Sequence, residues 1–362
     1  MDKKIKYIEI FEFYKERILS GEIKEDEKLP TEQEIREAFS VSRHTVRQAV
    51  AELEKEGYIY KEKNKGAYAK KLDKLKKTHN KLVIVITTYI SEYIFPYLIK
   101  GIQETLNENG YDILLLNTNN EKSKEKEQLE KLLEYDIAGA IIEPTASALG
   151  NTNKDCYMAI DKNNIPYIMI NAAYDKDKQS YVVMDDEKGT YMLCDYLINL
   201  GHKKIAGIFK EDDIQGLERK KGYIRSLEEN KIEIDSTIIG NFKTYEEDFY
   251  VYAFTKSLLS RSDRPTSIVC YNDKTAIKVI KVAKELGLRI PEDLSIVGYD
   301  NDETISNILD YGITTINHPK EEMGKKAANM LLSLINREKD RAFYEYTPEI
   351  LEKDSVRNIK NL

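Results

Sequence analysis

Residues 266–301 read TSIVCYNDKTAIKVIKVAKELGLRIPEDLSIVGYDN, and this stretch decides the fold of the larger part of the chain. Two short runs rich in valine and isoleucine, TSIVC and LSIVGYD, flank a helical pattern near residues 273–287. Strands joined by a helix of this length favour a parallel pair, because parallel neighbours need a long crossover connection. Polar residues follow each strand, beginning with Asn272 and Asp300.

The same alternation extends over residues 82–362. The apolar runs LVIVI, DILLL and AGAII precede amphipathic helical patterns near residues 92–109, 122–134 and 153–163. Alternating strands and helices predict parallel sheets with right-handed crossovers, and continuous apolar strands fit sheets that are covered on both faces. The units fall into two groups that divide around residue 180, so we expect an α/β domain of two lobes with a cleft between them.

Polar and aromatic side chains follow several of these strands, where ligands of open α/β sheets bind. The candidate ligand residues are Tyr89, Glu92, Tyr93, Phe95, Glu143, Asn171, Arg219, Asn272, Asp300 and His318. Amides, carboxylates and an arginine can hold hydroxyl groups, and aromatic faces can cover the C–H face of a sugar ring. Neither G-x-G-x-x-G nor G-x-x-x-x-G-K-S/T occurs, which argues against a phosphorylated ligand. For Asn272, a capping role on the following helix stays open.

The motifs LGHKKIAGIF, ERKKGY and ITTINHP, together with the stretch at 266–301, resemble the effector domain of the LacI/GalR family over nearly all of residues 82–357. That resemblance implies a two-lobed, periplasmic-binding-protein-like (type I) domain with parallel sheets. The residues at that family's sugar-contacting positions are Asn171, Arg219, Asn272 and Asp300, with His318 at a polar position nearby. Phe242 corresponds, more loosely, to an aromatic ring that often covers the sugar in that family.

The first 70 residues carry a different pattern. Residues 3–20 predict an amphipathic helix, and in LPTEQEIREAF the pair Thr31 and Glu34 has the spacing of a capping box. In VSRHTVRQAVAELEKEGY, Ser42 can cap a helix that begins at Arg43. The stretch YIYKEKNKGAYAKK then predicts a two-stranded hairpin with a basic tip. This order predicts a helix-turn-helix with a wing rather than a protein-binding helical module.

The second of these helices carries the residue types that read DNA. The candidate DNA-binding residues are Gln33, Ser42, Arg43, His44, Thr45, Arg47 and Gln48, with Lys65 and Gly66 in the hairpin. Arginine can donate two hydrogen bonds to guanine, and glutamine can pair with adenine in the major groove. Hydroxyls such as those of Ser42 and Thr45 can bind phosphates, and so can a basic hairpin tip.

The segments LPTEQEI, VSRHTVRQAV, LEKEGYI and NKGAY resemble the N-terminal domain of the GntR family of bacterial regulators. The resemblance implies a small α+β winged helix-turn-helix domain in which Gln33, the start of the second helix and the wing face an operator. The wing departs from that family, whose usual pattern is closer to GKGTFV. The predicted organisation is therefore a DNA-binding domain at 1–70, a lysine-rich linker at 71–81, and a sugar-binding and dimerisation domain at 82–362.

The fusion of these two domains resembles the arabinose-responsive repressors of Gram-positive bacteria, on stretches such as TTYISEYIFP, IIEPTASAL and GIFKEDDIQG. That resemblance implies L-arabinose as the effector, and a homodimer that leaves double-stranded operator DNA when the sugar closes the cleft. By analogy to the LacI/GalR family, the helices near 92–109 and 122–134 are the dimer interface. Another pentose, a hexose, a nucleoside, or an activating role stays an alternative.

Composition excludes several other classes of protein. A net charge of −7 means that the groups that bind DNA are concentrated in one place. Cys156, Cys194 and Cys270 are widely spaced, so neither a disulfide framework nor a metal site is expected, and no cofactor is implied. No apolar run approaches the ~20 residues of a membrane-spanning helix and no secretory signal is evident, which predicts a cytoplasmic protein. No G-x-S-x-G motif occurs, so an enzyme using Glu92 and Glu143 is a remote alternative.

Overall fold

The computed structural model describes residues 3–19, 22–24, 26–62, 65–70, 81–302 and 309–360. It divides into two compact units, Met1–Asn80 and Lys81–Leu362. Within the predicted linker, residues 71–80 lie outside the described residues. None of the helices in the described part of the chain has both the length and the apolar character needed to cross a membrane.

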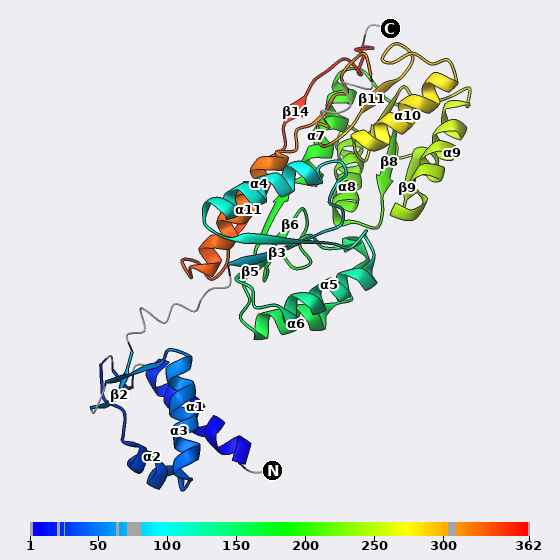
Figure 1. Cartoon of the computed structure of the whole chain (residues 1–362). Helices are drawn as coiled ribbons and strands as arrows, with labels where there is room; N and C mark the ends of the chain where they lie inside the picture. The colour runs from blue at the N-terminus through cyan, green and yellow to red at the C-terminus, as the bar shows by residue number, and fades with distance from the viewer. Residues whose placement is uncertain are drawn as a thin grey trace. The chain divides into compact units, whose positions relative to one another are not determined.

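The smaller unit is a winged helix-turn-helix, as predicted (Figure 1). Its elements are α1 (Lys3–Leu19), α2 (Glu32–Phe39), α3 (Arg43–Lys55), β1 (Ile59–Glu62) and β2 (Gly66–Ala69). Thr31 and Glu34 form the predicted capping box at the start of α2. The strands β1 and β2 pair in antiparallel register to form the wing. Apolar side chains from all three helices, among them Ile10, Ile35, Val46 and Leu53, meet in one buried core.

The larger unit contains two parallel sheets, which confirms the predicted fold class. The first sheet has the strand order β13-β7-β6-β5-β3-β4. Its strands are β3 (Leu82–Thr87), β4 (Asp112–Asn117), β5 (Gly139–Ile142), β6 (Tyr167–Ile170), β7 (Tyr181–Met184) and β13 (Phe343–Tyr346). The second sheet has the order β11-β10-β8-β9. Its strands are β8 (Ile205–Lys210), β9 (Ile239–Phe242), β10 (Ser267–Cys270) and β11 (Ser295–Val297).

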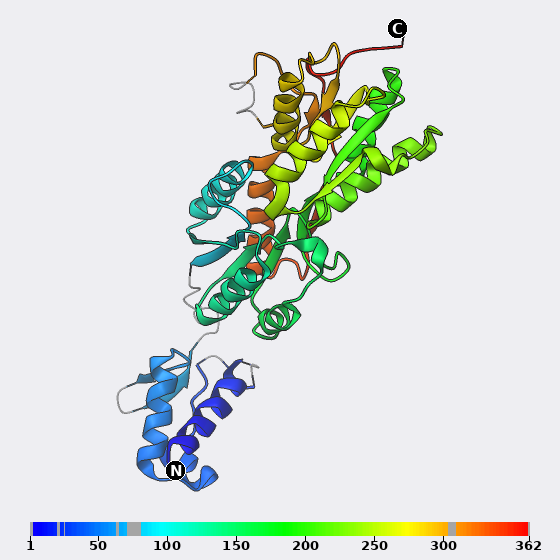
Figure 2. The same ribbon diagram turned by 90° about the vertical axis from the view of Figure 1, so that its right-hand side faces the viewer.

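Helices cover both faces of each sheet, which is why the central strands are apolar throughout (Figures 1 and 2). The first lobe carries α4 (Phe95–Glu108), α5 (Lys122–Glu134), α6 (Lys154–Lys162) and α11 (Lys320–Ile335). The second lobe carries α7 (Asp186–Asn199), α8 (Ile214–Glu229), α9 (Glu247–Leu259) and α10 (Asp273–Glu285). Helices α4 and α11 lie side by side, and so do α7 and α8. Helices α4 and α11 can approach closely because Gly101 and Gly324 have no Cβ atom, and a Cβ atom at either position would overlap the backbone of the facing helix.

The chain passes between the lobes three times. It leaves the first lobe after β7, a few residues beyond the division that we placed around residue 180. It returns at α11, which packs on α4 and β5–β7, and it leaves again between β13 and β14 (Ile350–Leu351). The strand β14 pairs with β12 (Thr315–Ile316) beside the second sheet. These crossings bring the carboxyl ends of strands from both lobes to one place.

Candidate functional site

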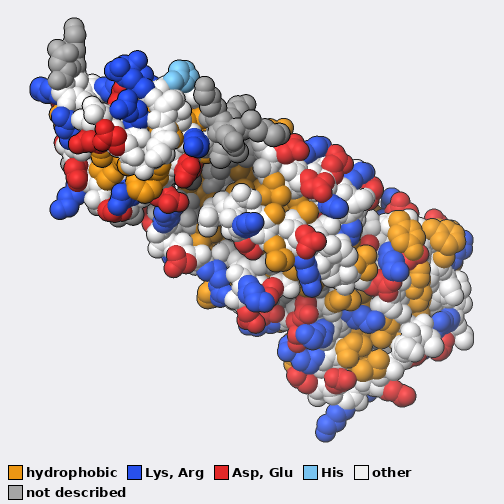
Figure 3. Space-filling model, turned by 90° about the horizontal axis from the view of Figure 1, so that it is seen from below, with side chains coloured by type: hydrophobic (Ala, Val, Ile, Leu, Met, Phe, Trp, Pro, Cys, Tyr) orange, Lys and Arg blue, Asp and Glu red, His pale blue; other side chains and the backbone are white. Residues whose placement is uncertain are grey.

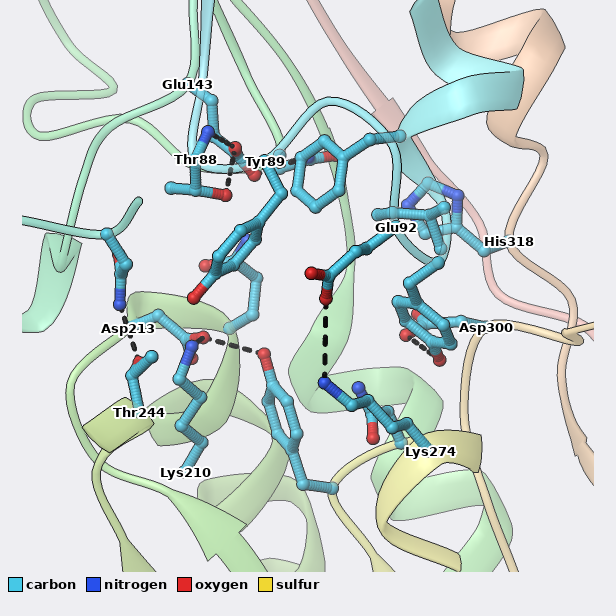
Figure 4. Close-up of a pocket in the computed structure, with 18 of the residues that line it drawn as sticks. Thr88, Tyr89, Glu92, Glu143, Lys210, Asp213, Thr244, Lys274, Asp300 and His318 are labelled. Atoms are coloured by element: carbon cyan, nitrogen blue, oxygen red, sulfur yellow. Dashed lines mark hydrogen bonds and ion pairs between the residues drawn. The ribbon is translucent and has the colours of Figure 1, made fainter. Parts of the chain in front are cut away.

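A cavity of about 120 Å³ lies between the two lobes (Figure 4). Ten of the eleven predicted ligand residues line it: Tyr89, Glu92, Tyr93, Phe95, Glu143, Asn171, Arg219, Asn272, Asp300 and His318. They come from the loops after β3, β5, β6, β10 and β11, from α8, and from the segment before α11. The rule that ligands bind beyond the carboxyl ends of parallel strands therefore located this wall from sequence.

A buried arginine holds two carboxylates at one end of the cavity. Arg219 on α8 donates from Nε to Asp186 Oδ1 at 2.9 Å and from Nη2 to Asp300 Oδ1 at 3.2 Å. Its Nη1 donates to the Tyr271 carbonyl at 2.7 Å, and its guanidinium lies 3.6 Å from the centre of the Tyr299 ring. Burial raises the pKa of Asp186 to about 6, although the arginine opposes that shift. The charge of Arg219 is thus already balanced inside the protein.

A second polar group comes from the first lobe. The buried carboxylate of Glu143 accepts from the Thr88 backbone N–H at 2.7 Å, from the Thr88 hydroxyl at 2.6 Å, and from Asn171 Nδ2 at 2.8 Å. Burial raises the pKa of Glu143, while these hydrogen bonds oppose the shift. They fix the side-chain amide of Asn171, whose buried Oδ1 has no partner within the described residues.

Two further residues differ in how much hydrogen-bonding capacity they leave for a ligand. Asn272 uses its side-chain oxygen to cap α10, accepting from the Thr275 backbone N–H at 2.9 Å, so its NH₂ group is the part that a ligand could use. The ring of His318 is buried, and its Nδ1 has no partner among the described residues. Burial lowers the pKa of His318 to about 4, so the ring is neutral at neutral pH.

Three residues of the cavity wall hold backbone conformations that are rare outside glycine. The φ angles of Tyr93, Asn171 and Asp300 are +57°, +65° and +91°. Such angles cost about 1–3 kcal/mol each and gather at functional sites, where the surroundings impose them. Tyr93 is further held by its hydroxyl, which donates to Asp300 Oδ2 at 2.6 Å across the lobes.

Phe242 lies in a different place from the one we predicted. Its ring is fully buried in the core of the second lobe and does not line the cavity. It contacts the ring of Tyr271 edge-on, at 6.0 Å between centroids, and Tyr271 is one of the aromatic side chains that line the cavity. The prediction failed because the last residue of β9 points into the layer of α9 and α10 rather than toward the first lobe.

This placement gives a testable prediction for Phe242. Replacing Phe242 with alanine should destabilise the second lobe by about 3–5 kcal/mol, because it removes a buried ring and leaves a void. Phe242→Leu, which keeps most of the apolar volume, should leave sugar affinity unchanged. Urea unfolding and calorimetric titration measure the two effects. If a folded Phe242→Leu protein bound sugar clearly more weakly, the ring of Phe242 would have to contact the sugar.

The structure adds cavity residues that the sequence did not single out as ligand contacts. They are Thr88, Ile94, Asn120, Pro144, Met184, Asp186, Lys210, Asp213, Gln215, Thr244, Glu247, Tyr271 and Lys274. Lys210 is a largely buried cation paired with Asp213 at 3.0 Å, and Tyr271 donates its hydroxyl to the same aspartate at 2.6 Å. Strand-end position points to Lys210 and could also have identified Tyr271, but Asp186 and Thr244 follow elements whose lobe assignment was not evident from sequence.

Helix α3 presents most of the predicted DNA-binding residues to solvent. Arg43, His44, Arg47 and Gln48 are exposed, whereas Val46, Val50 and Leu53 are buried. In Figure 3, a group of blue Lys and Arg side chains is visible at the upper left of the molecule. Glu32 at the start of α2 accepts from Arg47 Nε at 3.1 Å and Arg43 Nε at 3.4 Å. Gln33 is also exposed and donates to Glu37.

Ser42 and Thr45 have a structural role that the sequence suggested for only one of them. Ser42 caps α3 by accepting from the Thr45 backbone N–H at 3.2 Å, and the two hydroxyls are hydrogen-bonded at 2.8 Å. Thr45 is buried, so its hydroxyl supports the Ser42 cap rather than the phosphate contact that we expected of Thr45.

In the wing, Lys65 and Gly66 are exposed, as a contact with phosphates requires. Gly66 has a φ of +127°, and a Cβ atom there would meet the side chain of Lys28.

Comparisons with known proteins support both domains. A family model described as a periplasmic binding protein-like domain matches residues 194–356, and one described as bacterial regulatory proteins of the gntR family matches residues 6–68. An arabinose metabolism transcriptional repressor from Geobacillus stearothermophilus is 42% identical over 98% of both chains. Another with the same name, from Halalkalibacterium halodurans, is 38% identical over 98% of both chains.

A solved structure extends the comparison to the larger unit. A LacI family transcriptional regulator from Enterococcus faecium with bound ribose is 26% identical, with a TM-score of 0.66, and the match covers 77% of this chain and 100% of that one. The relatives are transcriptional regulators, which confirms the prediction that the chain is not an enzyme. The chain belongs to the family of arabinose metabolism transcriptional repressors, with a DNA-binding domain of the gntR type joined to a periplasmic-binding-protein-like effector domain.

Proposed function

We propose that L-arabinose binds in the cavity between the lobes and releases this repressor from its operator. The observation that carries the proposal is a pair of buried polar atoms on the cavity wall, Asn171 Oδ1 and His318 Nδ1, which find no partner in the part of the chain that the structure describes. Buried polar atoms are nearly always hydrogen-bonded, so a ligand with hydroxyl groups would complete both. Because the ring of His318 is neutral, Nδ1 can form a hydrogen bond with a sugar hydroxyl without placing a charge in the cavity.

The size and charge of the cavity support a small neutral sugar. The volume of about 120 Å³ is roughly ten times the 10–15 Å³ that one water needs on the same scale, and a pentose has about ten non-hydrogen atoms. Arg219 is balanced by Asp186 and Asp300, so it offers no free charge for a phosphate. The enterococcal relative has a pentose, ribose, bound. A larger hexose or a nucleoside is the alternative that these features favour less.

The proposed working form is a homodimer on double-stranded DNA, because two recognition helices are needed to match two half-sites. The exposed faces of α4 and α5, our predicted interface, carry charged residues with ion pairs such as Lys131–Glu127, and one large aromatic, Tyr97, which is 37% exposed. The second lobe instead exposes Tyr245 and Phe249, which are 81% and 80% exposed. We therefore include α9 in the proposed dimer surface. Light scattering of the full chain should give the mass of a dimer.

Calorimetric titration of the full chain against a panel of sugars tests the effector. The panel is L-arabinose, D-xylose, D-ribose, D-galactose and a nucleoside. The proposal expects the tightest binding for L-arabinose and loss of operator binding with the same sugar. If another sugar of the panel bound tightly and L-arabinose did not bind, that sugar would be the effector and the proposed site would still stand. Absence of binding for the whole panel would overturn the proposal.

The depressed pKa of His318 predicts how stability depends on pH. The pKa is about 4 in the folded protein and about 6.5 in an unfolded chain, so only the unfolded chain takes up a proton between these values. The stability that results from this difference in pKa is fully present above pH 6.5 and is lost as the pH falls toward 4. Between pH 7.5 and pH 5, wild type should lose about 2 kcal/mol more unfolding free energy than His318→Gln. Urea unfolding at both pH values measures the difference; equal losses would mean that His318 is not buried and neutral.

A further inference from the structure

The contacts that join the two lobes across the cleft fall into two groups. The first includes the Tyr93–Asp300 hydrogen bond and the Glu92–Lys274 pair, 3.9 Å apart, which lie beside the proposed sugar site. The second includes two further hydrogen bonds. Asn120 Nδ2 donates to Thr244 Oγ1 at 2.7 Å, and the backbone N–H of Ile214 donates to Ser147 Oγ at 2.8 Å.

The Asn120–Thr244 contact joins the edges of the two sheets that lie farthest from the crossings between lobes. Asn120 follows β4, the outermost strand of the first sheet, and Thr244 follows β9, the outermost strand of the second. The strands next to the crossings lie on the opposite sides of the sheets: β13 and β11 are the edge strands there, and β7 is the neighbour of β13. In Figure 4, Thr244 accordingly lies on the side of the cavity away from Asp300 and His318. A hinge opening about the crossings separates these far edges most, so it breaks this contact completely.

The Ser147–Ile214 contact supplies a helix in one lobe with a partner from the other. Ile214 is the first residue of α8, the helix that carries Arg219, and the first N–H groups of a helix have no partners within it. Asp213 caps a different N–H, that of Gly216, at 2.7 Å. The Ser147 hydroxyl therefore satisfies the Ile214 amide only while the cleft is closed. Ser147 is buried and does not line the cavity, so it does not reach a ligand there.

The two contacts start from two loops of the first lobe that are hydrogen-bonded to each other. Asn120 Oδ1 accepts from the Ala146 backbone N–H at 2.7 Å, so the same amide group that reaches Thr244 also fixes the loop beside Ser147. The fully buried carboxylate of Glu125 accepts from the Thr145 backbone N–H at 3.1 Å. Ala146 has a φ of +38°, which is unfavourable for alanine and is maintained by these bonds.

We propose that Asn120 and Ser147 form a latch across the rim of the cleft, which favours the closed lobes and so sets part of the sugar concentration needed for release. This inference rests on the proposed function, in which closed lobes bind sugar. A protein that binds ligand only when closed has an apparent affinity reduced by the fraction of time it is open. Glu92 and Lys274 contribute less to closure, because both are well exposed to solvent.

Ser147→Ala tests the latch because the residue lies outside the cavity wall. Loss of one hydrogen bond should weaken L-arabinose binding about two- to tenfold in calorimetry, while operator affinity without sugar stays unchanged. Ser333→Ala is the control: this serine donates its hydroxyl to the Met330 carbonyl within α11, whereas Ser147 accepts from a backbone N–H of the other lobe. Wild-type L-arabinose affinity in Ser147→Ala would overturn the latch.

Hydrogen exchange at the Ile214 amide distinguishes a latch from a merely structural bond. In wild type, L-arabinose should slow exchange at this amide, and in Ser147→Ala it should not. Equal protection with and without sugar would overturn the inference. If wild type does not bind L-arabinose, the proposed function fails. The latch then still predicts faster Ile214 exchange in sugar-free Ser147→Ala than in sugar-free wild type, and equal rates would overturn it.

Discussion

Arg219→Ala should weaken L-arabinose binding by at least about 100-fold and abolish release from the operator, while operator binding itself persists. The arginine joins Asp186 and Asp300 at the end of the cavity and stacks on Tyr299. Its removal leaves two buried carboxylates unpaired, a change that costs about 3–5 kcal/mol in comparable sites. Calorimetry with L-arabinose and operator titration with and without the sugar measure both sides of the prediction.

The control for this experiment is Arg219→Lys. Lysine keeps the positive charge but cannot hold two carboxylates and a carbonyl with one planar group, so sugar affinity should fall less than in Arg219→Ala. Circular dichroism should show that both variants keep the wild-type content of helix and strand. If L-arabinose still released Arg219→Ala fully from the operator, the assignment of Arg219 to the sugar site would be wrong.

Arg47→Ala should weaken operator binding about 5- to 150-fold and leave L-arabinose affinity unchanged. This range corresponds to the 1–3 kcal/mol that an arginine contributes when it binds guanine through two hydrogen bonds. Arg47 is exposed on α3, where its Nε contacts Glu32 in the free protein. That ion pair is open to solvent and is weak, so DNA can displace it at little cost.

Lys55→Ala is the matched control for Arg47. Lys55 is an exposed cation on the same helix, near its carboxyl end and paired with Glu52. Recognition helices contact bases through their amino-terminal residues, so this variant should bind operator nearly as wild type. Fluorescence anisotropy with a labelled operator measures both proteins. Equal affinities for Arg47→Ala and wild type would contradict the assignment of α3 as the recognition helix.

Much of the fold could be predicted because local signals agreed with one another. The capping box at Thr31 and Glu34 and the cap at Ser42 placed the starts of α2 and α3 correctly. The apolar strands of the larger unit were equally clear, since strands covered on both faces need no alternation. The position of β13 was not predictable: its exposed side chains, such as Phe343, carry no core pattern, and its parallel pairing with β7 is a long-range contact.

Site residues that directly follow strands could be predicted from the sequence. Those whose position depends on where the chain crosses between the lobes could not. Asn171, Asn272 and Asp300 follow strands that the apolar runs identify. Asp186 lies at the start of α7, and its role depends on the passage between lobes after β7, which no local pattern shows. Phe242 shows the opposite error, because a family position at a strand end does not say which face of the sheet its side chain takes.

Release of the repressor by sugar is measured by titrating the full chain with labelled operator, with and without saturating L-arabinose, and following fluorescence anisotropy. We expect the sugar to weaken operator affinity about 5- to 150-fold, the range of ordinary coupling free energies of 1–3 kcal/mol. An operator affinity that stays the same with L-arabinose and with every other sugar of the panel would contradict release by a sugar.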